Sequence, residues 1–204
     1  MSRPKYVPMV CVALLSIGLA ACSRNDGRTM KEPRADQTET IAIATTVPIP
    51  ETVSAGNDLP EMSLTTPWQP DEAIDVSFTC DGANSSPAIS WTGIAPTTGS
   101  LAIVLSDDDA PEYVHWVVSN IAPTTTGFAA GQVSPESVVA KNSSGVVGYS
   151  GPCPPPGTTH TYALTLYALD QKLEATPGGD ASAMRDAIEA ASTDATVSTF
   201  TFRR

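Results

Sequence analysis

Short apolar segments separated by turn-forming residues are the feature that most restricts how this chain can fold. Eighteen prolines and fourteen glycines are scattered along 204 residues without a period, which favours a loop-rich architecture over a helical bundle. Several apolar segments alternate with polar residues, as half-buried strands do. We predict six strands, at 74–79, 89–91, 101–105, 116–121, 162–169 and 196–202. The predicted fold class is mainly β, an antiparallel sandwich or barrel-like arrangement with one or two short helices.

One segment near the C-terminus has helical rather than strand periodicity. Ala181–Ala191 follows two glycines and Asp180, whose side chain can cap the first amide groups of a helix. Met184, Ala187, Ile188 and Ala191 recur at helical spacing, so they predict one buried face. We expect this helix to serve packing and to carry no chemistry.

The N-terminus has the features of an export signal. Arg3 and Lys5 precede the apolar run Met9–Ala21, which is shorter than the roughly 20 residues that a membrane-spanning helix requires. The run ends in Leu-Ala-Ala-Cys22, which resembles the lipobox of bacterial lipoproteins, although an ordinary signal peptide with a chance cysteine is the alternative. We predict a lipoprotein signal peptide at 1–21, with Cys22 lipidated and the protein anchored outside the cytoplasm of a bacterium.

The segment after Cys22 differs in composition from the remainder of the chain. Residues 22–60 are polar, rich in Thr, Pro and Glu, and poor in large apolar residues, so we predict a disordered tether followed by a folded domain at 61–204. The whole chain has 11 Lys and Arg against 22 Asp and Glu, a formal charge of −11. Nucleic acid would be repelled by such a surface, so we exclude it as a partner.

Titratable residues gather at the ends of the predicted strands. Asp107, Asp108 and Asp109 follow one strand, and His115 and His160 are the only histidines of the chain. In an extended segment Asp107 and Asp109 point the same way and Asp108 the opposite way, so two carboxylates can share one pocket. The alternative is an Asp-rich turn that is simply solvated.

These residues resemble the phosphatidylethanolamine-binding protein family, specifically its bacterial branch named for likeness to Raf kinase inhibitor protein. The resemblance lies in TCDGANSSPAISW, DDDAP, HWVVSNI, KNSSGVVGYSGPCPPPGTTHTY and LYALD, within residues 78–170. It implies an antiparallel β-sandwich with a small anion-binding pocket at one end. Carried over by position, the ligand-binding residues would be Asp107, Asp109, His115, Pro152, Pro154, His160 and Tyr162. Where the family usually has proline, this chain has Asp108, and we expect its loop to be looser.

Such a pocket is chemically plausible for a small anion or zwitterion. Imidazoles donate hydrogen bonds to phosphate or carboxylate oxygens, and nearby carboxylates can hold them in a donating form or receive an ammonium group. We therefore predict a non-enzymatic binding module without a cofactor or metal. The alternatives are a protein inhibitor of a kinase or protease acting through its surface, with that target as its partner, and a metal-dependent hydrolase using Asp109, His115 and His160.

The cysteines left after cleavage at Cys22 are Cys80 and Cys153. An exported pair can form a disulfide in an oxidising compartment, and we predict that these two are joined. Two separately buried thiols are the alternative. Neither cysteine belongs to a C-x-x-C motif, so zinc and thioredoxin-like chemistry have no support.

Overall fold

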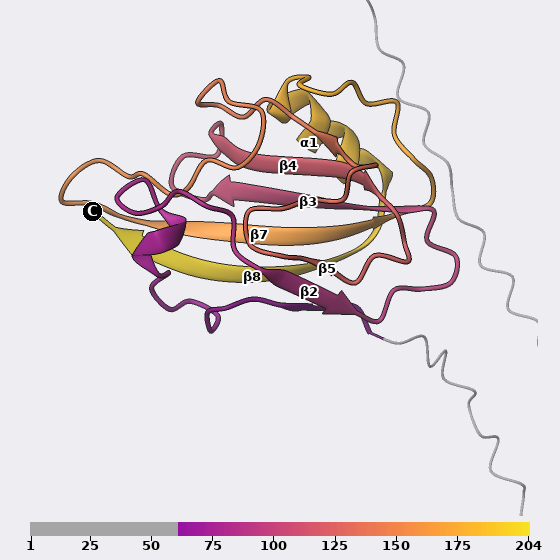
Figure 1. Ribbon diagram of the computed structural model, residues 1–204, viewed down its shortest axis with the longest axis horizontal. Helices are drawn as coiled ribbons and strands as arrows, with labels where there is room; N and C mark the ends of the chain where they lie inside the picture. The colour runs from indigo at the N-terminus through magenta and orange to yellow at the C-terminus, as the bar shows by residue number, and fades with distance from the viewer. Residues whose placement is uncertain (1–60) are drawn as a thin grey trace, which may run out of the picture. The chain divides into compact units, whose positions relative to one another are not determined.

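The computed structural model describes residues 61–204, so the predicted signal peptide, the lipidated Cys22 and the tether all lie outside the described residues (Figure 1). The described chain contains eight strands, one 3-10 turn and one α-helix. In chain order they are β1 (Ser63–Thr65), η1 (Val76–Phe78), β2 (Ile89–Thr92), β3 (Ser100–Asp107), β4 (Val114–Ile121), β5 (Gly127–Phe128), β6 (Val138–Val139), β7 (Thr159–Leu169), α1 (Ala181–Ala191) and β8 (Ser192–Arg203).

The strands form two antiparallel sheets. The smaller has the order β1-β2-β5, and the larger has the order β6-β4-β3-β7-β8. Long strands pair at the centre of the larger sheet, where β3 runs in unbroken register with β7 from Ser100 opposite Leu169 to Asp107 opposite Tyr162. This register places the end of β3 beside the beginning of β7 at one end of the larger sheet, where the candidate site lies.

Both faces of the larger sheet are covered, and this explains why β3 and β4 are buried almost throughout. One face packs against the smaller sheet through residues such as Trp91, Ile103 and Leu166. The other face packs against α1, where Val104, Val117 and Ile188 meet. Figure 1 shows α1 beside β3 and β4, with β2 and β5 on the opposite side of the sheet. The observed class is the predicted one, a mainly β antiparallel sandwich with one α-helix.

The predicted helix is confirmed with both of its bounds. Asp180 caps it by accepting a hydrogen bond from the Ala183 amide at 3.0 Å. Ala181, Met184 and Ile188 are its buried residues and pack against the sheet, as the spacing predicts. Within residues 61–204 no helix has the length and apolar character that crossing a membrane requires.

The prediction of a strand at 74–79 is wrong. That segment contains the 3-10 turn η1, because the Asp75 carboxylate accepts hydrogen bonds from both the backbone N–H and the hydroxyl of Ser77. The other five predicted strands exist, each with longer bounds than predicted. Strands β1, β5 and β6 were not predicted, because segments of two or three residues are too short to show an alternating pattern.

Candidate functional site

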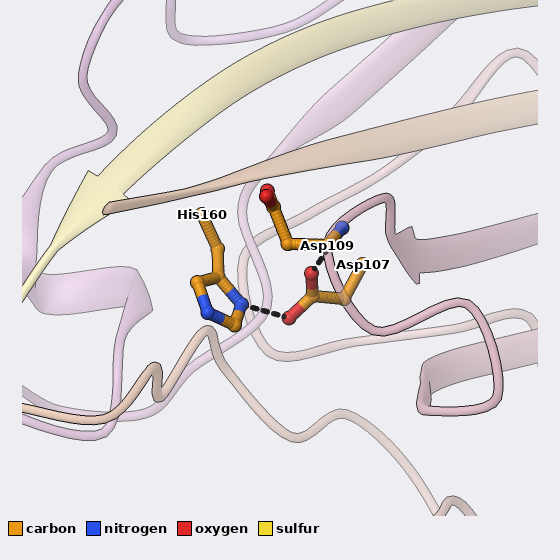
Figure 2. A group of neighbouring side chains, drawn as sticks. All are labelled: Asp107, Asp109 and His160. Carbon is orange, nitrogen blue, oxygen red and sulfur yellow. Dashed lines mark hydrogen bonds and ion pairs between the residues drawn. The ribbon is translucent and has the colours of Figure 1, made fainter. Parts of the chain in front are cut away.

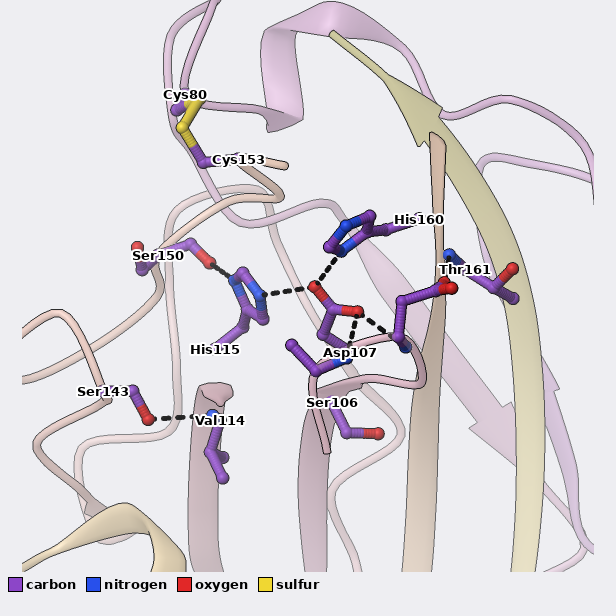
Figure 3. Close-up of polar contacts among 12 residues, drawn as sticks. Cys80, Ser106, Asp107, Val114, His115, Ser143, Ser150, Cys153, His160 and Thr161 are labelled. Carbon is purple, nitrogen blue, oxygen red and sulfur yellow. Dashed lines mark hydrogen bonds and ion pairs between the residues drawn. A yellow bond between two sulfur atoms is a disulfide. The ribbon is translucent and has the colours of Figure 1, made fainter. Parts of the chain in front are cut away.

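The sequence-predicted polar residues converge at one end of the larger sheet. Asp107 is the last residue of β3, His115 lies near the start of β4, and His160 and Tyr162 lie near the start of β7. Figure 3 shows the two imidazoles approaching the Asp107 carboxylate from different sides. Three strands therefore supply the side chains of one cluster.

A break in strand register brings His115 to this cluster. Leu105 pairs with Trp116, but the next residue of β3, Ser106, pairs with Val114, so His115 is an extra residue on β4. Such a bulge interrupts the strict alternation of side chains. Trp116 packs between the two sheets, and the His115 ring lies edge-on to Tyr162 with centroids 5.4 Å apart. Because of this bulge, His115 contributes to the site while the next residue, Trp116, packs in the core.

Asp107 is the hub of the cluster and is almost fully buried, with 4% of its surface exposed. Its Oδ1 atom accepts hydrogen bonds from the Asp109 and Ala110 amides at 2.9 and 3.1 Å. Its Oδ2 atom accepts a hydrogen bond from His160 Nδ1 at 2.8 Å and lies 4.0 Å from His115 Nε2. These contacts fix the carboxylate in one orientation.

Asp109 lies beside Asp107, with its carboxylate on the same side of the loop (Figure 2). It accepts a hydrogen bond from the Thr161 amide at 2.7 Å. Asp108 is exposed, and its own amide donates to the Thr161 carbonyl at 2.9 Å. Proline has no amide hydrogen, so the residue that departs from the family pattern adds a bond, which argues against the looser loop that we expected. The surrounding loop removes some water from the Asp108 carboxyl, and this desolvation, together with the negative charges of Asp107 and Asp109, raises the pKa of Asp108.

The His115 ring has a defined proton position. Its Nδ1 atom lies 2.8 Å from the Ser150 carbonyl oxygen, which can only accept, so Nδ1 carries the hydrogen. In the neutral ring the Nε2 atom is then a bare acceptor facing Asp107. Burial lowers the pKa of His115, against the opposing effects of the Ser150 carbonyl and the Asp107 carboxylate. The neutral form is therefore favoured, which differs from the donating imidazole that the sequence suggested.

Tyr162 completes the floor of the cluster. Its side chain is fully buried, directly opposite Asp107 in the strand pairing. Burial raises the pKa of Tyr162, and the nearby Asp107 charge raises it further, so its hydroxyl keeps its hydrogen. Among residues 61–204, two buried side-chain polar atoms have no hydrogen-bond partner, and these are the Tyr162 hydroxyl and His115 Nε2. Both belong to this one cluster.

The segment that holds His115 is cross-linked to the loop around η1. Cys80 and Cys153 form a disulfide with their Cα atoms 5.4 Å apart. Close by, the Gly151 amide donates to Asn84 Oδ1 at 2.7 Å, and the Cys80 amide donates to the Pro152 carbonyl at 3.1 Å. A Cβ atom on Gly151 would lie 2.3 Å from the Phe78 carbonyl oxygen, so only glycine fits there.

Pro152 and Pro154 both lie in this cross-linked segment and are buried. Sequence reasoning did not identify Ser150 or Asn84 as supporting residues. Both act across long sequence separations, one through a backbone carbonyl and the other through an amide side chain, and no local pattern reports such contacts.

The cluster also limits the metal alternative. In the described part of the chain, the side chains that come close enough to share an ion are those of Asp107, Asp109 and His160, whose ligand atoms lie within 4.8 Å of one another. This differs from the set of Asp109, His115 and His160 considered from the sequence. The carboxylates in this group already accept hydrogen bonds from amides and from His160 Nδ1, so an ion would have to compete with those donors.

Fold and site together define a β-sandwich with a polar cluster at one end of a sheet. Comparison with known protein families and solved structures identifies the class of protein. The profile described as "Phosphatidylethanolamine-binding protein" matches residues 65–203, and the chain belongs to this family. The structure is similar to that of Escherichia coli YbcL, described as a member of the mammalian PEBP family, with a TM-score of 0.66, 25% identity, and coverage of 71% of this chain and 99% of YbcL. The CT736 homologue of Chlamydia trachomatis gives a TM-score of 0.63 at 26% identity, covering 70% of this chain and 97% of that one.

Relatives in sequence extend the same assignment. A protein of Mycobacterium tuberculosis named "Putative lipoprotein LppC" is 38% identical over 168 residues, covering 80% of this chain and 79% of its own. A UPF0098 protein of Methanothermobacter thermautotrophicus is 44% identical over 123 residues, covering 57% of this chain and 81% of its own. The family assignment supports a binding module in general terms.

Proposed function

We propose that the cluster around Asp107 is a binding pocket for a small phosphorylated or carboxylated group, such as a phospholipid headgroup. The observation that carries the proposal is the pair of buried, unpartnered polar atoms, His115 Nε2 and the Tyr162 hydroxyl. Leaving such atoms unsatisfied costs about 1–3 kcal/mol each, so a ligand that pairs with them gains that free energy. His160 is partly exposed beside them and offers an approach from solvent.

The carboxylates suit a zwitterionic ligand better than a bare polyanion. Asp109 is exposed at the mouth of the cluster, where it can receive an ammonium group such as that of ethanolamine. A phosphate group would then lie against the imidazoles and the Tyr162 hydroxyl. This arrangement pairs each charge of the headgroup with the opposite charge or with a hydrogen-bond donor.

Replacing His160 with alanine tests the pocket. In calorimetric titrations of the full chain with O-phosphoethanolamine, His160→Ala is expected to weaken binding by about 1.5–3 kcal/mol, the range for a hydrogen bond to a charged group. In the parent, the ligand should shift both imidazole resonances in NMR spectra. Thr159→Ala is the matched control, because Thr159 is the preceding residue on β7 and is exposed. Unchanged affinity in a folded His160→Ala protein would remove this residue from the site.

We further propose that the domain is anchored by lipid at Cys22, outside the cytoplasm of a bacterium. Support comes from the Leu-Ala-Ala-Cys sequence after a short apolar run and from similarity to a relative named as a lipoprotein. A Cys22→Ala protein is expected to leave the detergent phase in partitioning experiments, whereas Cys80→Ala and Cys153→Ala proteins should remain there. Equal partitioning of parent and Cys22→Ala proteins would contradict the anchor.

A further inference from the structure

The proposed pocket has an unusual balance of hydrogen-bond donors and acceptors at its floor. His115 donates through Nδ1 to the Ser150 carbonyl, so its Nε2 atom presents a lone pair. Asp107 Oδ2 lies 4.0 Å away and can only accept. The Tyr162 hydroxyl is the one unpartnered donor among these buried groups in the described chain. A ligand that contacts these two acceptors must therefore supply a hydrogen-bond donor.

The charges around the floor point the same way. Asp107 ends β3, and Asp108 and Asp109 continue into the loop. His160 and Tyr162 face the floor from β7, while Tyr113 packs against the His115 ring with centroids 4.7 Å apart. The carboxylates of Asp107 and Asp109 therefore stand beside two imidazoles, and burial favours the neutral form of His115 by lowering its pKa. An anion that is fully ionised would meet mostly acceptors and negative charge.

Building on the proposed function and narrowing it, we propose that the pocket selects an oxyanion that still carries a proton, namely a phosphate monoester in its monoanionic form. Carboxylates and the phosphodiester of an intact phospholipid headgroup lack this hydrogen and are expected to bind more weakly. The ester's P–OH group would donate to the acceptor pair of Asp107 Oδ2 and His115 Nε2, and an ionised oxygen would accept from the Tyr162 hydroxyl. A sulfate ester has the same shape but no such hydrogen. A carboxylic acid loses its proton near pH 4, so at neutral pH it lacks the donor too.

A matched pair of ligands tests the selection directly. O-phosphoethanolamine and ethanolamine O-sulfate differ mainly in the central atom and in this one hydrogen. At pH 5.5 the phosphate ester, with a second pKa of about 6, is mostly a monoanion and thus equals the sulfate ester in charge. In calorimetric titrations of the full chain we expect the sulfate ester to bind about 10- to 100-fold more weakly, the effect of one hydrogen bond to a charged group.

Proton counting gives a second readout. At pH 7.5 the free phosphate ester is mostly a dianion, so binding of the monoanion must take up close to one proton per ligand from the buffer. Titrations in two buffers with different ionisation enthalpies measure that number. An uptake near zero would contradict the proposal.

The Asp107→Asn variant tests whether Asp107 accepts the hydrogen bond from the P–OH group of the ligand. Its amide keeps an oxygen for the Asp109 and Ala110 N–H groups and replaces the acceptor Oδ2 with a donor, so the preference for phosphate over sulfate should fall toward one. Asp108→Asn is the matched control, because it removes a neighbouring exposed charge and should leave the preference unchanged.

The possible results distinguish selection for the protonated ester from the proposed binding of anions in general. If both esters bind the parent protein equally, an anion pocket exists but does not select for the proton. If neither ester binds, the proposed function itself fails. An unchanged preference in a folded Asp107→Asn protein would overturn the role of Asp107. Should that variant not fold, the ester comparison in the parent still decides.

Discussion

The middle and the end of the larger sheet are held together in different ways. In the middle, β3 and β7 pair in continuous register, and residues such as Ile103 and Leu166 are completely buried between apolar neighbours. At the end, the register of β3 and β4 shifts, and Asp107 is held by amides and an imidazole rather than by packing. A buried polar group needs a hydrogen-bond partner in a specific position, whereas an apolar side chain can pack against many different apolar neighbours.

This contrast implies that the site end depends on a few connections. Ser150 holds His115 through two hydrogen bonds, from the ring to the Ser150 carbonyl and from the Ser150 amide to the His115 carbonyl. The segment at 149–153 is itself held by a disulfide and a small set of hydrogen bonds. Removing one of these bonds at the site end should therefore alter the geometry of the site. Truncating one aliphatic side chain in the middle of the sheet should lower only the free energy of unfolding. The predictions below test that difference, from the largest effect to the smallest.

The largest effect is expected from loss of the disulfide. The paired change Cys80→Ser and Cys153→Ser should lower the free energy of unfolding by about 4 kcal/mol, because the bond closes a loop of 73 residues in the unfolded chain. Urea unfolding monitored by tryptophan fluorescence measures this change. The parent protein unfolded under reducing conditions is the control and should show the same loss. An unchanged midpoint would show that the hydrogen bonds alone hold the site end.

A smaller loss is expected from a cavity in the middle of the sheet. Leu166→Ala should lower the free energy of unfolding by about 3 kcal/mol, since a fully buried leucine loses its contacts there. Affinity for O-phosphoethanolamine should stay within about twofold of the parent, provided that measurements are made where both proteins are folded. Thr165→Ala, on the other face of β7, is the matched control and should cost much less. A large loss of affinity in Leu166→Ala would show that the two regions are coupled.

The smallest effect concerns pH. Because burial lowers the pKa of His115 in the folded protein, the unfolded chain binds more protons than the folded one below about pH 6.5. Stability is therefore full above that pH and is lost as the pH falls through the lowered folded pKa, at no more than about 1.4 kcal/mol per pH unit from this one group. Urea unfolding of parent and His115→Gln proteins between pH 7.5 and 4.5 should show a shallower acid loss in the variant. Identical slopes would place the acid sensitivity in other groups.

The sequence predicted the middle of the sheet much better than its end. Runs such as Leu101–Leu105 are apolar and flanked by turn residues, and the helix at Ala181–Ala191 has both a cap and a periodic face, so local patterns were sufficient. At 74–79 the same alternating pattern was misleading, because hydrogen bonds from Ser77 to the Asp75 side chain favour a turn. Local side-chain bonds of this kind compete with strand formation.

For the site, the sequence identified which residues gather but not how they bond. Asp107, Asp109, His115, His160 and Tyr162 converge because β3, β4 and β7 bring their ends together. The direction of each hydrogen bond depends on partners far along the chain, such as Ser150 for His115. The bulge at His115 and the amide bond of Asp108 likewise arise from strand pairing, which composition and periodicity do not report.

Arg204 lies at this same end of the sheet, and its contacts make the site end depend on strand β8. Arg204 pairs with Asp81 at 3.0 Å, its side chain contacts the Cys153 sulfur, and its carbonyl accepts a hydrogen bond from Gly157. Strand β8 adds Phe202 opposite His160. A growing chain therefore cannot close this end until β8 and Arg204 have been synthesised, long after the residues of β3 and β4.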